Sequence, residues 1–348
     1  MAYSTINKST DHFNTVTFTG NNSTQNITGV GFQPDWVWLK KRNGTANNHV
    51  VDAVRGVGYY LYPNLANAQG GSGNSLLTAF GADGFTLDNG ADSNGSGATG
   101  VSWNWKAGTT SGITTDGNTT ITPTAYSFNQ TSGISIIKYV GNGTTGAKVA
   151  HGLGVAPKMV MFKSLDTTDW WNVHHTSLGS NSELYLNGQD AAPGSTGNGT
   201  TPDAVNLELE GTGNAHNGNG NNYIAYCFAE KLGYSKIGSY THNGQSGNNG
   251  NFIYTGMKVK FLMLKNASAG STDWLIQDTT RSTGNEVDDC LFANANSAES
   301  VNYNIRFLSN GFKLSGSGPT MGGSGNTVIF IAFGQTLNSS NNVPCTAF

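Results

Sequence analysis

The sequence predicts an all-β protein made of three tandem β-sandwich or jelly-roll-like domains. Strand-like runs rich in Val, Ile, Phe, Tyr, Trp and Thr are separated by turn residues, and helix signals are scarce. One strand pattern also occurs three times and ends on a lysine each time, at 36–40 (WVWLK), 159–163 (MVMFK) and 261–265 (FLMLK). Because a pattern that recurs at a regular spacing indicates a repeated structural unit, we expect a tandem array of similar domains.

Other landmarks keep the spacing of this strand. Its final lysines, Lys40, Lys163 and Lys265, are 123 and 102 residues apart. A second strand, near the end of each unit, has bulky residues at alternate positions and recurs at nearly the same spacing. Its three copies are 101–107 (VSWNWKA), 224–230 (IAYCFAE) and 329–335 (IFIAFGQ). Units of about 100 residues can each hold a hydrophobic core, so a string of small domains is expected rather than a solenoid of short repeats.

Composition and the repeats together predict the domain boundaries. The first domain with its polar lead-in covers 1–108, the second covers 133–232, and the third covers 233–337, followed by a polar tail at 338–348. The segment 109–132 is rich in Thr, Gly and Ser and is predicted to be an extended linker. We therefore expect the first two domains to hinge. The second and third domains follow each other without a linker and should dock rigidly.

The repeated strand is apolar on both faces. In the first copy, Trp36 and Trp38 point to one side, whereas Val37 and Leu39 point to the other. Such a strand is expected in the centre of a two-layer sandwich, where both of its faces are covered.

Composition excludes several classes of protein. Only 11% of the residues are charged and the formal net charge is −3, so there is no basic field to attract nucleic acid or anionic lipid. Three cysteines are too few for a disulfide framework or a thiolate zinc site. The first residues lack a signal-peptide pattern, and no stretch approaches the ~18 apolar residues of a membrane span. We expect no membrane insertion, no metal site and no cofactor.

The strand that follows each lysine carries the candidate site residues. Asp52 and Arg55 in the first copy match Asp278 and Arg281 in the third. A carboxylate and a guanidinium at this spacing predict structural ion pairs that hold a turn or bridge two sheets.

The second copy differs at these positions. There the alignment places His174 and Ser177, next to His175 and the pair Trp170 and Trp171. Sugar-binding sites favour an aromatic ring under the apolar face of a pyranose, with polar side chains around it. These aromatic and imidazole groups are therefore a candidate ligand-binding site, with ordinary packing as the alternative.

No catalytic residue is predicted. The chain lacks a Gly-x-Ser-x-Gly elbow between a strand and a helix. Carboxylate pairs such as Glu208 with Glu210, or Asp288 with Asp289, have no feature that marks them for glycoside hydrolysis. The stretch 88–95 (DNGADSNG) lacks the first and last ligands of a calcium loop, so a polar turn is expected.

Four segments of the sequence carry a family resemblance. They are 222–230 (NYIAYCFAE), 233–240 (GYSKIGSY), 31–40 (GFQPDWVWLK) and 151–157 (HGLGVAP). They resemble an uncharacterised repeat family of virion proteins from tailed phages of marine bacteria and cyanobacteria, described as tail-fibre-like with lectin-like sandwich domains. The third copy departs from this pattern at 256–259 (GMKV), where an aromatic residue and a proline are expected.

The resemblance implies a non-enzymatic structural protein on the virion exterior, assembled in the host cytoplasm. It favours a fibre or appendage that contacts host surface polysaccharide alongside other virion proteins, as a homo-oligomer and preferably a trimer. The alternative is a capsid or tail accessory protein that decorates and stabilises the particle without binding a receptor. A polysaccharide depolymerase is a third, less favoured alternative.

Overall fold

The fold is all-β, which confirms the predicted class. The computed structural model describes residues 4–71, 76–89, 92–194 and 199–336. The first unit, 13–105, contains β1 (Phe13–Thr19), β2 (Gln25–Ile27), β3 (Trp36–Lys41), β4 (His49–Asp52), β5 (Leu77–Gly81), β6 (Gly84–Leu87) and β7 (Thr99–Trp105). The second unit, 125–228, contains β8 (Ala125–Asn129), β9 (Ile134–Val140), β10 (Ala147–Ala150), β11 (Met159–Ser164), β12 (Asn172–His175), β13 (Glu183–Tyr185), β14 (Thr200–Pro202), β15 (Asn206–Leu209) and β16 (Asn222–Phe228).

The third unit, 235–335, contains β17 (Ser235–Thr241), β18 (Phe252–Tyr254), β19 (Lys258–Asn266), β20 (Trp274–Asp278), β21 (Val287–Phe292), β22 (Ser300–Leu308), β23 (Gly311–Leu314) and β24 (Thr327–Gln335). Helical structure within the described ranges is restricted to single 3-10 turns. They are Ser9–Asp11, Asp92–Asn94, Thr176–Leu178, Gly247–Asn249 and Pro319–Met321.

Each unit contains an inner and an outer set of strands with the same topology. The inner sets run β1-β7-β3-β4, β9-β16-β11-β12 and β17-β24-β19-β20, and the outer sets run β2-β6-β5, β10-β15-β14 and β18-β23-β22. Apolar residues from both sets form a separate core inside each unit. In the third unit β21 links the two sets into one eight-stranded sheet. The alternating pattern of the strands therefore folds into sandwich-like layers three times.

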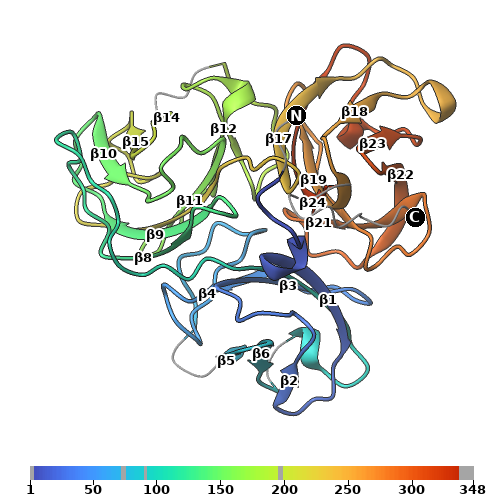
Figure 1. The fold of residues 1–348 in the computed structure, drawn as a ribbon, viewed down its shortest axis with the longest axis horizontal. Helices are drawn as coiled ribbons and strands as arrows, with labels where there is room; N and C mark the ends of the chain where they lie inside the picture. Colours follow the sequence, from blue (N-terminus) through green and yellow to red (C-terminus); the bar gives the residue numbers. More distant parts are fainter. Residues whose placement is uncertain (1–3, 72–75, 90–91, 195–198, 337–348) are drawn as a thin grey trace.

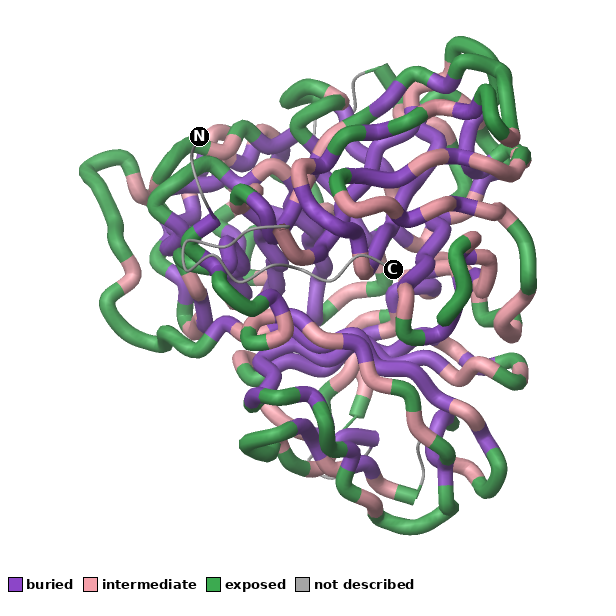
Figure 2. Tube along the Cα trace, turned by 45° about the vertical axis from the view of Figure 1, so that its right-hand side comes forward, coloured by how far each residue is buried: buried purple, intermediate pink, exposed green. Residues whose placement is uncertain are grey.

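The three inner sheets share a further core at the centre of the molecule. Figure 1 shows the three lobes arranged around this centre, and Figure 2 shows buried chain running through it. Four equivalent positions of each unit fill it: Trp36, Trp38, Trp103 and Trp105; Met159, Met161, Tyr226 and Phe228; Phe261, Met263, Ile331 and Phe333. The space left between them is only about 10 Å³, at the lower limit for a single water, and its lining is apolar. We call this cluster the central core.

The central core explains why the repeated strand is apolar on both faces. Trp36 and Trp38 of β3 lie in the central core, whereas Val37 and Leu39 lie in the core of the first unit. The expectation that both faces are covered is therefore correct. One of the two covering layers, however, consists of the neighbouring units rather than the second sheet of the same sandwich.

The segment 109–132, expected to be an extended linker, is packed against the second unit. Its end forms β8, which pairs with β9, and the buried Ile121 bridges to Val149. The hydroxyl of Ser127 on β8 donates to the buried carboxylate of Asp35 in the first unit (2.9 Å). The expected hinge between the first two domains is therefore wrong, because the units share a core and buried hydrogen bonds.

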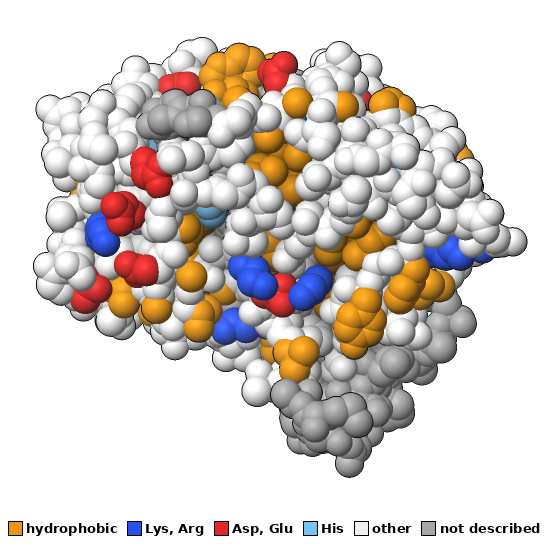
Figure 3. Space-filling model, turned by 90° about the horizontal axis from the view of Figure 1, so that it is seen from above, with side chains coloured by type: hydrophobic (Ala, Val, Ile, Leu, Met, Phe, Trp, Pro, Cys, Tyr) orange, Lys and Arg blue, Asp and Glu red, His pale blue; other side chains and the backbone are white. Residues whose placement is uncertain are grey.

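The surface reflects the low content of charged residues. The face in Figure 3 is mostly covered by uncharged polar and backbone atoms, with scattered charged and apolar side chains. No helix within the described ranges is long and apolar enough to cross a membrane. The expected polar tail at 338–348 lies outside the described residues.

Candidate functional site

The lysines that end the repeated strand connect the units. All three are buried, and each ammonium donates hydrogen bonds to backbone carbonyl oxygens of its own unit and of the neighbouring unit. The bonds between units are Lys40 Nζ to Asn296 O (3.3 Å), Lys163 Nζ to Ala66 O (3.1 Å) and Lys265 Nζ to Gln189 O (3.2 Å). The first unit thus contacts the third, the second contacts the first, and the third contacts the second. Burial lowers the pKa of all three lysines to about 8.

A second ring of hydrogen bonds lies beside the lysines and runs in the same direction. Its donors are a side-chain amide in the first unit and indole groups in the other two. The bonds are Asn48 Nδ2 to Phe292 O (3.0 Å), Trp171 Nε1 to Tyr62 O (2.9 Å) and Trp274 Nε1 to Tyr185 O (2.9 Å). Trp171 is 1% exposed, so it holds two units together and cannot stack against a sugar at the surface. Its assignment as a ligand-binding residue is corrected.

The two expected ion pairs are present and form part of a third ring. Arg55 Nε lies 2.5 Å from Asp52 Oδ2, and Arg281 Nε lies 2.6 Å from Asp278 Oδ2, with all four side chains buried. Each carboxylate also accepts a hydrogen bond from the next unit: Tyr226 Oη to Asp52 Oδ2 (2.7 Å) and Trp103 Nε1 to Asp278 Oδ2 (2.9 Å). The pairs therefore hold a turn in their own unit and fasten the neighbouring unit.

The second unit has a neutral version of this ring. His175 lies opposite Met159, as Asp52 lies opposite Trp36. The residue of the third unit that corresponds to Trp103 and Tyr226 is Ile331, whose side chain has no donor. Because a buried carboxylate would lack this partner, an uncharged imidazole is the better occupant. Burial lowers the pKa of His175 to about 4, so it is neutral at neutral pH.

The geometry of His175 and His174 corrects the sequence alignment by one residue. The Nδ1 atom of His175 accepts the backbone N–H of Ser177 (3.1 Å) and so caps the turn, as Asp52 does through the backbone N–H of Arg55 (2.8 Å). His174 lies opposite Val160 and faces the interior of its own sandwich. Both histidines are buried, so neither belongs to a surface site.

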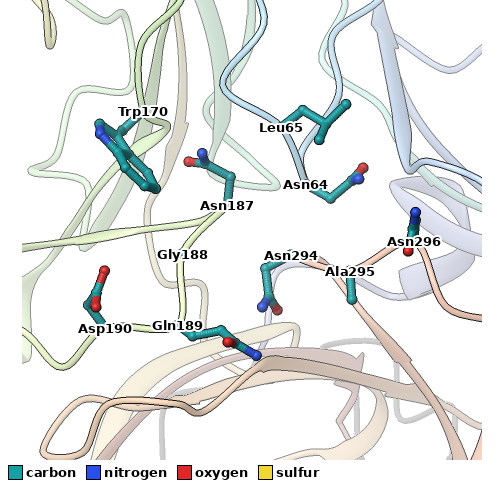
Figure 4. Close-up of a pocket in the computed structure, with 10 residues that line it drawn as sticks. All are labelled: Asn64, Leu65, Trp170, Asn187, Gly188, Gln189, Asp190, Asn294, Ala295 and Asn296. Carbon is teal, nitrogen blue, oxygen red and sulfur yellow. The ribbon is translucent and has the colours of Figure 1, made fainter.

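Trp170 is the one candidate residue of the second unit that reaches the surface, with 45% of its area exposed. It borders a pocket of about 580 Å³ that we call the axial pocket (Figure 4). The other walls are three loops, 64–65, 187–190 and 294–296, one from each unit. These loops follow Tyr62, Tyr185 and Phe292, the acceptors of the second ring. The axial pocket therefore lies where the three units meet, at the end that contains the lysines.

An asparagine stands at the same place in each of these loops. Its Oδ1 atom accepts a backbone N–H from the residue that also donates in the second ring. These bonds join Asn48 to Asn64 (2.9 Å), Trp171 to Asn187 (2.9 Å) and Trp274 to Asn294 (2.8 Å). The asparagines are thus held rigidly at the floor of the axial pocket.

The amide NH₂ groups of these asparagines differ between the units. That of Asn64 donates to Asn47 Oδ1 (2.8 Å), and that of Asn294 donates to Asp273 Oδ1 (2.7 Å). The corresponding residue of the second unit is Trp170, which has no acceptor, and Asn187 Nδ2 makes no hydrogen bond to the described part of the chain. Comparing Asn47, Trp170 and Asp273 in a correct alignment would have shown this difference in the sequence.

The axial pocket combines an aromatic surface with neutral polar groups. The indole of Trp170 packs on the ring of Tyr185, with centroids 5.0 Å apart and a 33° tilt, so its orientation is set. Gln189 Nε2 is held by Asp273 Oδ1 (2.7 Å), and Asp190 adds the only ionisable side chain of the lining. No group of three His, Cys, Asp or Glu side chains in the described ranges could hold a metal ion. The pocket can stack against a flat apolar face and exchange hydrogen bonds around it.

The carboxylate pairs considered from the sequence have other contacts. Glu208 pairs with Lys148 (3.1 Å) and Glu210 accepts from Thr201 (2.8 Å), both on the outer sheet of the second unit. The backbone N–H groups of Asp288 and Asp289 donate to the hydroxyl of Ser282 in a turn. Neither pair lines the axial pocket.

Comparison with known proteins identifies a family for nearly the whole chain. A family designated as a domain of unknown function, DUF7483, matches residues 8–336. No curated protein and no solved structure matches the chain.

Proposed function

We propose that this chain, which belongs to the DUF7483 family, is a non-enzymatic structural protein on the exterior of a phage virion that contacts host surface glycan through the axial pocket. The observation that supports this proposal is the exposed indole of Trp170, held against Tyr185 beside neutral amide groups. Aromatic platforms with a few fixed polar groups are typical of sites that bind pyranose rings.

The architecture suits a fibre or appendage. The central core and the buried rings make one rigid body of three units, which can transmit a contact at its surface without bending. We propose that further oligomerisation, with a trimer favoured, and contacts with other virion proteins add to this body on the particle.

The proposal is tested by glycan binding of the purified full chain. The protein should bind polysaccharide from the surface of a host cell, and Trp170→Ala should weaken binding because the stacking surface is lost. Tyr254→Ala is the matched control, since Tyr254 is an aromatic residue that is 65% exposed on β18 and does not line the axial pocket. Absence of binding to any host polysaccharide would contradict the proposal.

A capsid or tail accessory protein that stabilises the particle is the second candidate. It is favoured by the burial of Trp171 and His175 in contacts between units and of His174 inside its own sandwich, which leaves these three residues no access to a ligand. Electron microscopy of labelled particles separates the two roles: a position on a projecting fibre or appendage supports the first, and one on the capsid faces or the body of the tail supports the second.

A further inference from the structure

We infer that the axial pocket binds an uncharged pyranose without a metal ion. In this site Trp170 provides the stacking surface and Asn187 provides a hydrogen-bond donor, and this combination is specific to the second unit. This inference rests on the proposed function, because it names the ligand class of the same pocket. It is carried by the difference between the second unit and the other two.

One residue change explains both halves of the pair. In the first and third units, the residue before the second-ring donor is Asn47 or Asp273, and its side-chain oxygen binds the NH₂ group of the loop asparagine. Trp170 at this place supplies the indole and removes the acceptor at the same time. The Nδ2 atom of Asn187 is therefore left to donate to a ligand that stacks on Trp170 (Figure 4).

The charges around the axial pocket favour an uncharged ligand. Asp190 is the only ionisable residue of the lining. The nearby ammonium groups of Lys163 and Lys265 are buried and donate to backbone carbonyl oxygens, so they cannot pair with an anionic sugar. A uronic acid would place its carboxylate near Asp190, and the Lys265 ammonium that already faces Asp190 and Asp273 is buried and bound to backbone carbonyl oxygens, so it cannot form a direct ion pair with the sugar. The hydroxyl groups of a neutral sugar can instead donate to the Asp190 carboxylate and accept from Asn187.

The lining offers few free oxygen ligands to a hard cation, because the Oδ1 atoms of its loop asparagines (Asn64, Asn187 and Asn294) already accept backbone N–H groups and Asp190 is its one carboxylate. Stacking on the indole and hydrogen bonds to fixed amides are then the contributions to binding. Binding should consequently be unaffected by a chelator.

The test uses variants that copy the other units. Trp170→Asp reproduces the third unit and Trp170→Asn reproduces the first, so either variant should give Asn187 an internal partner. Both should fold with unchanged or slightly raised thermal stability. Both should bind a neutral glucan or mannan about tenfold or more weakly, because a stacking contact and a hydrogen bond are lost together. Asn187→Ala keeps the indole and should lose a smaller part of the affinity.

Tryptophan fluorescence gives a direct readout. Trp170 is 45% exposed, whereas the other six tryptophans are buried, so quenching by iodide should report on Trp170. A neutral oligosaccharide should protect it from quenching in the wild-type protein, in the presence or absence of EDTA. Alginate, as an anionic polysaccharide, should not protect it.

The outcomes separate the inference from the proposed function. If the wild-type chain binds no glycan, the proposed function itself fails. If it binds a neutral glycan and both Trp170 variants bind equally well, glycan binding stands and its assignment to the axial pocket is overturned. Loss of binding in EDTA, or preferential binding of alginate, would overturn the ligand class.

Discussion

Removing the carboxylate of Asp278 should destabilise the protein strongly, because it leaves a guanidinium buried without its main counter-charge. Asp278 accepts from Arg281 Nε (2.6 Å), from Trp103 Nε1 of the first unit (2.9 Å) and from two backbone N–H groups of its own turn. The side chains of Asp278 and Arg281 are both fully buried. Asp278→Ala therefore affects a turn and a contact between units at once.

The expected magnitude follows from the burial of the pair. Breaking a buried ion pair by removing one partner costs about 3–5 kcal/mol. Glu299 keeps a contact with Arg281 Nη1 (2.8 Å), so part of the charge stays compensated and the lower end, about 3 kcal/mol, is expected. In Asp278→Ala/Arg281→Met both charges are removed. The remaining cost in unfolding free energy, about 1–3 kcal/mol, comes mainly from Trp103 Nε1 and the backbone N–H groups of the turn, which lose their acceptor. The double variant should therefore be more stable than Asp278→Ala alone.

Urea unfolding followed by fluorescence and circular dichroism measures these free energies. Asp11→Ala is the matched control, since Asp11 pairs with Lys8 (3.0 Å) on the surface, where both side chains are more than half exposed. It should change the unfolding free energy by less than about 1 kcal/mol. A cost below about 1 kcal/mol for Asp278→Ala, or a double variant less stable than the single one, would refute this reasoning.

Three further predictions concern pH and the third ring. Four buried histidines have a folded pKa of about 4, below the unfolded value of 6.5, so the unfolded chain binds more protons in this range. The free energy of unfolding should therefore fall as the pH is lowered from 6.5 to 4. A urea midpoint that does not change with pH in that range would contradict this. These histidines are His49, His174, His175 and His216. The repeat lysines have a folded pKa of about 8 against 10.5 in the unfolded chain, so the unfolded chain binds more protons above pH 8. The free energy of unfolding should therefore rise from pH 8 to 10, by up to about 1.4 kcal/mol per lysine and pH unit. A steady decline over this range would exclude the lowered pKa of these lysines. Tyr226→Phe removes a hydrogen-bond donor to the buried Asp52 carboxylate and should lower the free energy of urea unfolding by about 1.5–3 kcal/mol. An unchanged free energy of unfolding would show that the third ring does not hold the units together.

The sequence predicted the local structure because alternating apolar residues report on strands directly. It also identified the Asp52 and Arg55 pair from its recurrence in the third copy, since the chemistry of a buried turn is local. The contacts between units could not be predicted in this way. In the sequence, Lys40 and its equivalents only mark the spacing of the repeated strand, and nothing in a strand pattern shows that their ammonium groups reach a carbonyl of another unit.

The candidate site was predicted at the wrong residues because the sequence alignment of the second unit was shifted by one residue. Because side chains alternate between the faces of a strand, a shift of one residue exchanges the two faces. The sequence alignment placed His174 at the Asp52 position, whereas the pairing of β11 with β12 places His175 there. Directly before β12, Trp171 is buried between units, whereas its neighbour Trp170 is exposed at the axial pocket. Neighbouring residues that looked like one cluster therefore serve different faces.

Differential scanning calorimetry of the full chain tests most directly whether the three sandwiches form one body around the central core. The shared core and the rings of buried hydrogen bonds predict a single transition, with a calorimetric enthalpy close to the van't Hoff enthalpy. Three independent domains joined by linkers would instead unfold separately, and their summed calorimetric enthalpy would be about three times the van't Hoff value. A ratio near one supports the shared core, and a ratio near three, or resolved separate transitions, would contradict it.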